Sequence, residues 1–209
     1  MIADIVIPKN NEAEFVEVAH KLGIKKLLLL YNFDEYDKNK IQEKIDSTEN
    51  KKINLQIGFI VNQKNINKAA KQSNLLVVKS SDKDRFFVES KKIRIIYGFE
   101  GFHKKDYLHQ RASGLNHIIC ELANKNNVCI GLSYSQFFNK NHILASLLIG
   151  RITQNIALCN KYKVKTVIGS FSENPYELRA SHDIMSLFAI LGMDRKKING
   201  YLANGFLTS

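Results

Sequence analysis

The sequence contains no tryptophan, two prolines and three cysteines among its 209 residues. The cysteines, Cys120, Cys129 and Cys159, are odd in number and form no C-x-x-C pair, which argues against a disulfide framework and against a thiolate zinc site. Each lies among apolar residues, so we expect three small buried side chains. With so few prolines and no low-complexity linker, the chain is expected to form one domain over residues 1–209.

Long hydrophobic runs are also missing. No stretch reaches the roughly eighteen uninterrupted apolar residues of a membrane-spanning helix. The apolar run at residues 24–31 is short and contains Lys25 and Lys26. The first eight residues contain Asp4 and no basic start, which is unlike a secretory signal. We therefore expect a cytoplasmic protein that has no membrane partner.

The sequence lacks the usual signatures of an enzyme site. Neither G-x-x-x-x-G-K-[ST] nor G-x-G-x-x-G occurs, the six histidines fall in expected helices or loops, and acids are sparse at the expected strand ends. Ser181-His182-Asp183 is not read as a triad, because successive helical side chains point in different directions. Ser181 is instead expected to cap a helix. No catalytic residue and no metal ligand is therefore predicted.

Positive charge is the most informative feature that is present. Lysine and arginine number 31 against 20 acids, giving a formal net charge of +11 and a pI near 9.5. Such a balance favours a polyanionic partner, RNA or DNA first. The alternative is a biased composition in which lysines on every face serve only for solvation, and charge alone does not decide between the two.

Short apolar runs alternate with helical patterns along the whole chain. Strands are expected at residues 3–7, 24–31, 53–61, 75–79, 93–97, 128–133 and 164–170. Helices are expected at residues 11–22, 37–47, 65–72, 84–90, 111–124, 141–162, 181–191 and 194–200. This order predicts an α/β fold, an irregular TIM-type (β/α) barrel with parallel strands inside and helices outside. A doubly wound open sheet is the alternative.

Two stretches in the second half carry a more specific pattern. They contain Asp106–Arg111 with Ser113–His117, Gln154-Asn155-Ile156, Val167–Ser170, Pro175-Tyr176-Glu177, and Arg179 with His182-Asp183. In order and spacing these motifs resemble the ribonuclease P protein subunit p30 family, called component 3 in archaea. The first half fits more loosely, but the resemblance covers essentially the whole chain.

The resemblance implies an irregular TIM-type barrel without the metal ligands of the related phosphatases. It also implies a non-catalytic, RNA-binding subunit of ribonuclease P, in which the RNA subunit holds Mg²⁺ and removes the 5′ leader of precursor tRNA. The implied partners are the ribonuclease P RNA, precursor tRNA within the holoenzyme, a small ferredoxin-like protein subunit and the other protein subunits. No cofactor is expected on the protein itself.

Arginine is rare in this lysine-rich chain and contacts phosphate in a bidentate way, so arginines within the motifs rank first as RNA ligands. The predicted RNA-binding residues are Arg111 and Arg179, followed by Arg94, Lys104, Lys105 and Lys163. For Arg111 the structural alternatives are a helix cap or a pair with Glu100, and for Arg179 a pair with Glu173 or Asp183.

Other residues and other functions remain open. Arg151, within an apolar stripe, is expected in a structural ion pair. Tyr107, Phe99 and Phe102 are candidates for stacking on bases, although core packing is favoured for the phenylalanines. The competing functions are a metal-dependent barrel phosphoesterase acting without RNA and a protein–protein adaptor.

Overall fold

The structure, a computed structural model, describes residues 3–37, 41, 43, 53–103, 105–138, 141–194 and 198. Seven strands form one sheet in which every strand lies parallel to the next strand along the chain. They are β1 (Ala3–Val6), β2 (Lys26–Asn32), β3 (Asn54–Ile60), β4 (Leu76–Lys79), β5 (Ile95–Tyr97), β6 (Cys129–Ser133) and β7 (Thr166–Gly169).

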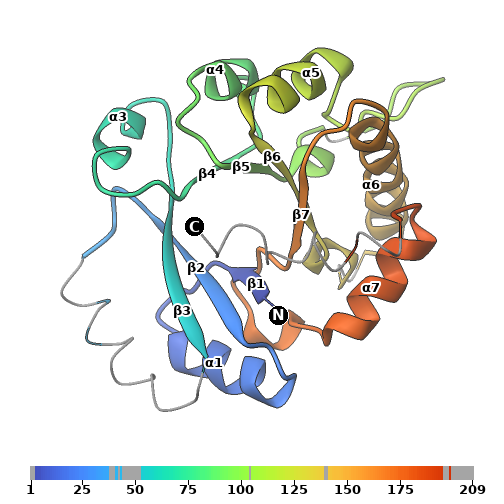
Figure 1. The fold of residues 1–209 in the computed structure, drawn as a ribbon. Helices are drawn as coiled ribbons and strands as arrows, with labels where there is room; N and C mark the ends of the chain where they lie inside the picture. The colour runs from blue at the N-terminus through green and yellow to red at the C-terminus, as the bar shows by residue number, and fades with distance from the viewer. Residues whose placement is uncertain are drawn as a thin grey trace.

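Helices surround this sheet (Figure 1). The α-helices are α1 (Glu12–Lys21), α3 (Ile66–Ala69), α4 (Asp84–Glu89), α5 (His117–Asn126), α6 (His142–Lys161) and α7 (Ser181–Ile190). Three 3₁₀ turns follow strands, namely η2 (Phe99–Gly101), η3 (Ser135–Phe138) and η4 (Pro175–Glu177). The expected helices at residues 37–47 and 194–200 lie largely outside the described residues.

The sheet closes on itself where β1 meets the segment after β7. The Phe171 N–H donates to the Ile5 carbonyl at 2.7 Å, and the Ile7 N–H donates to the Ser172 carbonyl at 2.8 Å. A parallel bridge also joins Val6 to Ser172. The predicted irregular TIM-type barrel is confirmed, and the open doubly wound sheet is wrong. The barrel is irregular because it has seven strands and because its seam is formed beyond the end of β7.

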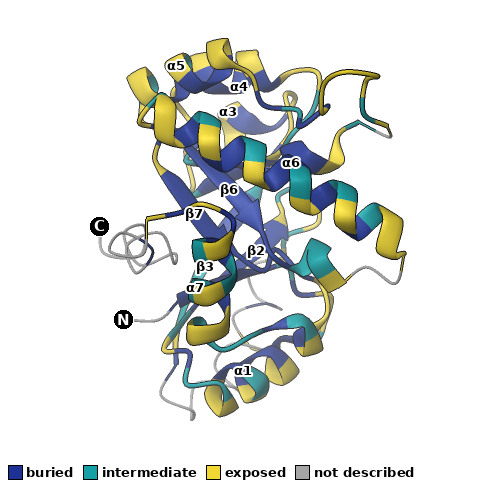
Figure 2. Ribbon diagram, turned by 90° about the vertical axis from the view of Figure 1, so that its right-hand side faces the viewer, coloured by how far each residue is buried: buried dark blue, intermediate teal, exposed yellow. Residues whose placement is uncertain are grey.

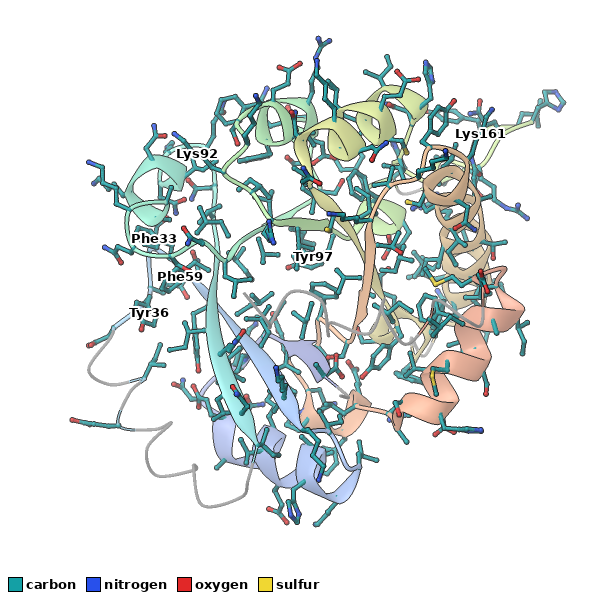
Figure 3. All side chains as sticks on the ribbon, in the orientation of Figure 1. Phe33, Tyr36, Phe59, Lys92, Tyr97 and Lys161 are labelled. Carbon is teal, nitrogen blue, oxygen red and sulfur yellow. The ribbon has the colours of Figure 1, made fainter. Side chains whose placement is uncertain are left out.

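The strands are buried on both sides, as their continuous apolar runs predict. One cluster fills the barrel interior, where the rings of Tyr97 and Phe171 stack with centroids 4.4 Å apart. Tyr97 lies at the centre of the ring of strands in Figure 3. A Cβ at Gly131 would lie 2.8 Å from the Tyr97 Cβ and 2.9 Å from the Phe171 Cζ, so only glycine leaves room for this stack.

Helix α6 covers β6 and β7 from outside (Figure 2). Asn141 begins it by accepting from the Ile143 and Leu144 N–H groups, both at 3.1 Å. By length and composition alone α6 could cross a membrane. However, Ile152 and Ile156 pack in the core between strands and helices, and the helix also buries a charged residue, as described below. We therefore describe it as a covering helix of the barrel.

Helix α5 begins later than the sequence predicts. The expected start at residue 111 is wrong, since Asn116 caps the helix by accepting from the Ile119 N–H at 2.9 Å. A long loop at residues 98–116 precedes it. Gly114 fixes this loop with φ of 79°, and a Cβ there would lie 2.2 Å from the Phe99 carbonyl oxygen. Tertiary contact thus overrides helix propensity in this segment.

Helix α7 differs from expectation only at its first residue. Ala180 occupies the N-cap position without a side-chain hydrogen bond, and Ser181 is already helical. Ser181 is therefore not the predicted cap. The Asp183 carboxylate stands in the first turn of the helix, where it is favoured by the helix dipole.

Candidate nucleic-acid interface

The carboxylate nearest the barrel seam is held by internal hydrogen bonds. Asp4 Oδ1 accepts from the Ile5 and Ser170 N–H groups, both at 2.7 Å, and Oδ2 accepts from the Tyr134 hydroxyl. Burial raises the pKa of Asp4 to about 6, although these hydrogen bonds act in the opposite direction. The network ties β1 to the segments after β6 and β7, so Asp4 serves the closure of the barrel.

Two other buried acids stand after strand ends and are engaged in the same way. Glu100, after β5, accepts from Gln136 Nε2 at 2.8 Å, and its burial raises its pKa to about 7. Asp84, after β4, accepts from the Ser80 hydroxyl at 2.7 Å, and burial raises its pKa. In the part of the chain that the structure describes, no three histidine, cysteine, aspartate or glutamate side chains gather closely enough to hold a metal ion.

An open cleft of about 780 Å³ lies at the carboxyl ends of β1, β2 and β3. Its charged lining is mostly acidic and consists of Lys9, Glu12, Glu35, Asp37 and Glu173. The Lys9 ammonium is already paired with Glu173 at 2.6 Å. The cleft therefore presents negative charge, which repels phosphate and makes it a poor site for RNA.

A buried arginine fixes the long loop between β5 and α5. Arg151, on α6, is fully buried, and its Nε donates to Asp106 Oδ1 at 2.7 Å. Its Nη1 donates to the carbonyls of Glu100 and His103 at 2.8 and 2.6 Å. Asp106 also accepts from the Ala112 N–H at 2.8 Å. The prediction of a structural ion pair for Arg151 is confirmed, with Asp106 as the partner.

Two of the predicted RNA-binding residues lie on this loop. Arg111 and Lys105 are exposed, whereas Lys104 lies outside the described residues. The Arg111 guanidinium lies along α6, since a Cβ at Gly150 would be 2.8 Å from its Nε. Arg111 cannot cap α5, which begins at His117, and the Glu100 carboxylate is buried against Gln136 instead. Contact of Arg111 and Lys105 with RNA stays a prediction.

The tip of the loop exposes apolar side chains. Tyr107 and Leu108 are 64% and 91% exposed, and Phe102 is 45% exposed. Phe99 is fully buried, as expected for a core residue. The predicted core packing of Phe102 is wrong, because the loop that follows η2 runs outward from the barrel, as the yellow-green trace at the upper right of Figure 1 shows. Phe102 and Tyr107 are available to stack on a base or to contact a protein.

Arg179 is engaged by its own surroundings. Its Nη1 donates to the carbonyls of Tyr176 and Leu178 at 2.9 and 2.7 Å, and its guanidinium lies 4.0 Å from the centroid of the Phe138 ring. The alternative pairs with Glu173 or Asp183 are not formed, since Glu173 pairs with Lys9 and Asp183 lies beside His182. A role in RNA binding stays a prediction for Arg179.

The predicted RNA-binding residues do not form one cluster. Lys105, Arg111 and Arg179 follow strands, whereas Arg94 and Lys163 immediately precede β5 and β7. In a barrel of parallel strands, the two groups lie at opposite ends. Other lysines share the second position: Lys25, Lys91, Lys92 and Lys165 also come just before strands.

The chain is similar to known proteins along most of its length. The family model described as RNase P subunit p30 matches residues 1–203. Ribonuclease P protein component 3 of Methanococcus maripaludis is 22% identical over 182 residues, covering 83% of this chain and 75% of that protein. The Thermococcus gammatolerans counterpart is 30% identical over 129 residues, covering 61% of this chain and 56% of that protein. A chain of the cryo-EM structure of archaeal ribonuclease P with mature tRNA shares the fold, with a TM-score of 0.78 at 20% identity, covering 95% of this chain and 87% of that chain.

Proposed function

Because this chain belongs to the RNase P subunit p30 family, it is a protein subunit of ribonuclease P, and we propose that it works there by binding RNA. The match of the family model over residues 1–203 carries this conclusion. The holoenzyme matures the 5′ ends of tRNA. The net charge of +11 supports the RNA-binding role, since cationic side chains relieve the repulsion between the phosphates of a folded RNA.

We propose further that the chain contributes no catalytic group, and that the RNA subunit holds the Mg²⁺ ions and cleaves the phosphodiester. The state of the buried acids supports this division. Asp4, Glu100 and Asp84 each accept hydrogen bonds from neighbouring groups of the barrel, and their protonated forms are favoured by burial. A carboxylate whose oxygens already accept hydrogen bonds is a poor ligand for a hard cation. Glu100 Oε2 accepts none, and for this residue it is the protonated form, favoured by burial, that makes a poor ligand.

The proposed partners are the ribonuclease P RNA, precursor tRNA within the holoenzyme, and a small ferredoxin-like protein subunit. A cytoplasmic location is proposed with them. It is supported by the free state of the buried cysteines, of which Cys120 and Cys159 lie within hydrogen-bonding reach of each other without a disulfide.

A role as a protein–protein adaptor is a second candidate, and it is favoured by the loop that exposes Phe102, Tyr107 and Leu108. Aromatic and apolar side chains of this kind are enriched at the centres of protein interfaces. This role is compatible with RNA binding, because the loop and the strand-preceding lysines occupy different ends of the barrel.

Reconstitution tests the proposed function. Archaeal ribonuclease P RNA is assayed for cleavage of precursor tRNA with the other protein subunits present, with and without this chain, over a series of Mg²⁺ concentrations. We expect the chain to raise the rate most at low Mg²⁺, because it replaces part of the ionic screening. Cleavage by the protein alone, abolished by a chelator, would instead establish the metal-dependent phosphoesterase. No effect of the chain at any Mg²⁺ concentration would contradict the proposal.

A further inference from the structure

Basic residues gather in the turns that lead from a helix into the next strand. The structure describes five such turns, at residues 22–25, 70–75, 90–94, 127–128 and 162–165; none contains an acid, and all except 127–128 contain basic residues. The basic residues are Lys25, Lys71, Lys91, Lys92, Arg94, Lys163 and Lys165. Lys125 and Lys161 extend the group from the ends of α5 and α6. We call the surface formed by these residues the basic face.

The opposite end of the barrel has a different balance of charge. The described turns that lead from a strand into the next helix contain more acids than bases, including Asp34, Glu35, Asp37 and Glu173. Of the described acids near the basic face, Glu89, at the end of α4, is paired with Arg85 at 2.8 Å, and Asp194 follows α7. Among the described residues, charge is therefore positive in the turns at the amino ends of the strands and slightly negative in the turns at the opposite end.

Two lysines of the basic face occupy backbone positions that favour glycine. Helices α1 and α7 are each followed by a glycine in the left-handed conformation, Gly23 with φ of 71° and Gly192 with φ of 99°. The residue after the C-cap of α6 is Lys163, with φ of 55°, and the corresponding residue of α4 is Lys91, with φ of 58°. A left-handed conformation costs a residue with a Cβ about 1–2 kcal/mol. Glycine would give the more stable backbone at both positions.

Two cations of the basic face, Arg94 and Lys165, are positioned by backbone hydrogen bonds to β6. The Cys129 N–H, in β6, donates to the carbonyl of Arg94, which precedes β5, at 2.9 Å, and the Ile130 N–H donates to the Lys165 carbonyl at 2.9 Å. Arg94 and Lys165 therefore flank the start of β6, about two strand spacings, or ~10 Å, apart at the backbone. Lys165 also donates to Asn127 Oδ1 at 3.1 Å, which joins two of the turns.

The face is turned toward the reader in Figure 3, where Lys92 and Lys161 are labelled on its rim, on the α4 side and on the α6 side. Its turns offer almost no aromatic side chain for base stacking, since Tyr162 is the one aromatic residue among these five described segments, and it is half-buried. Cations without stacking platforms favour the backbone of a double helix over unpaired bases.

We propose that the basic face binds the phosphate backbone of a double-helical segment of RNA, and that it is the main RNA-binding surface of this subunit. The inference rests on the proposed function and specifies its site. Of the six residues predicted from the sequence, it assigns Arg94 and Lys163 to this surface and adds Lys91 and Lys165. The acidic cleft at the other end of the barrel is left outside the RNA contact.

The backbone conformation of Lys91 and Lys163 provides the test. The double variant Lys91→Gly/Lys163→Gly should bind a transcript of archaeal ribonuclease P RNA at least about tenfold more weakly at about 0.1 M salt, since each lost phosphate contact removes its counterion release. The same variant should melt at the same temperature as the original chain or a higher one, because glycine relieves the left-handed strain. Opposite effects on binding and stability are not expected from damage to the fold.

Three further variants serve as controls. Lys64→Gln/Lys83→Gln removes the same charge from strand-to-helix turns and should change affinity by less than about twofold, because these lysines lie away from the proposed contact. Lys91→Arg/Lys163→Arg should retain binding. Lys91→Gln/Lys163→Gln removes the charge without adding glycine, and it should lose binding as the glycine variant does.

The outcomes separate this inference from the proposed function. The inference is supported if the glycine and glutamine variants of Lys91 and Lys163 bind weakly, while the arginine variant and the Lys64→Gln/Lys83→Gln variant bind normally. The inference is overturned, while RNA binding stands, if the original chain binds the transcript and the glycine and glutamine variants of Lys91 and Lys163 bind it equally well. It is also overturned if the Lys64→Gln/Lys83→Gln variant loses as much affinity as those two variants. If the original chain does not bind the transcript at all, the proposed RNA-binding role fails with it.

Discussion

Replacing Arg151 by methionine tests whether a single buried guanidinium holds the long loop against the barrel. Methionine fills much of the same volume but removes the hydrogen bonds to Asp106, Glu100 and His103. Breaking a buried ion pair from one side costs about 3–5 kcal/mol, and the two abandoned carbonyls add to that cost. Asp106 has a side chain that is 27% exposed and can regain water, so we expect the lower end of that range, about 3 kcal/mol.

Arg85→Met is the matched control. Arg85 pairs with Glu89 at 2.8 Å, nearly the 2.7 Å of the Arg151–Asp106 pair, but its side chain is 70% exposed. An exposed pair one helical turn apart contributes about 0.3–0.5 kcal/mol. Urea unfolding measures both free energies, and the thermal midpoint should fall by about 10 °C for Arg151→Met alone. Equal effects of the two substitutions would refute the reasoning that burial, and not ion pairing as such, determines the contribution.

Four other substitutions have outcomes that follow from the structure. Burial raises the pKa of Asp4 from 3.8 to about 6, so the folded state retains a proton that the unfolded chain releases; the resulting stability is present below about pH 4 and is lost as the pH rises through 6. Asp4→Asn keeps the size of the side chain and the oxygen that accepts from Ile5 and Ser170, but replaces the oxygen that accepts from Tyr134 with a donor. Between pH 4 and 8 in urea titrations, the stability of this variant should fall by about 3 kcal/mol less than that of the original chain, and equal pH profiles would contradict this. Gly131→Ala should lower the free energy of unfolding by about 1–3 kcal/mol by displacing the Tyr97–Phe171 stack, and a near-UV spectrum unchanged from the original chain would argue against that cause. Arg179→Ala should lower the free energy of unfolding by about 1–2 kcal/mol, because the hydrogen bonds to the Tyr176 and Leu178 carbonyls are lost. Arg111→Ala should leave the melting curve nearly unchanged. Equal melting curves for the two variants would show that the Arg179 contacts contribute nothing.

The fold could be predicted because its main determinants are local. Strands buried on both sides are continuous apolar runs, as in β2, where Leu27–Leu30 are all fully buried. Their alternation with helices leaves few arrangements of a parallel sheet. Closure of the barrel was harder to foresee, since it depends on Asp4, Ser170 and Phe171 meeting across the chain. No pattern within β1 or β7 indicates that contact.

The start of α5 shows where sequence reasoning fails. Residues 111–116 have no helix-breaking proline, yet they remain a loop because Arg151 holds Asp106, Asp106 holds Ala112, and Gly114 takes a left-handed conformation. These constraints come from a helix about forty residues further along the chain. Local propensity cannot include them.

Sequence reasoning identified only some residues of the proposed basic face, for a related reason. Each lysine that precedes a strand looks, by itself, like an ordinary solvated residue. The barrel turns these scattered positions into one surface, because all parallel strands begin at the same end. Ranking arginines by their rarity selected Arg94 together with Arg111 and Arg179, which lie at the other end of the strands. The proposed basic face instead ranks residues by their position relative to the strands.

The salt dependence of RNA binding tests the central claim most directly. The affinity of the chain for a ribonuclease P RNA transcript is measured from about 50 to about 200 mM monovalent salt, and log K is plotted against log of the salt concentration. Five or more lysine or arginine contacts with phosphates predict a straight line with a slope of about −4 or steeper. An affinity that hardly changes over this range would contradict the account, because it would mean that the positive charge of the barrel does not hold the RNA.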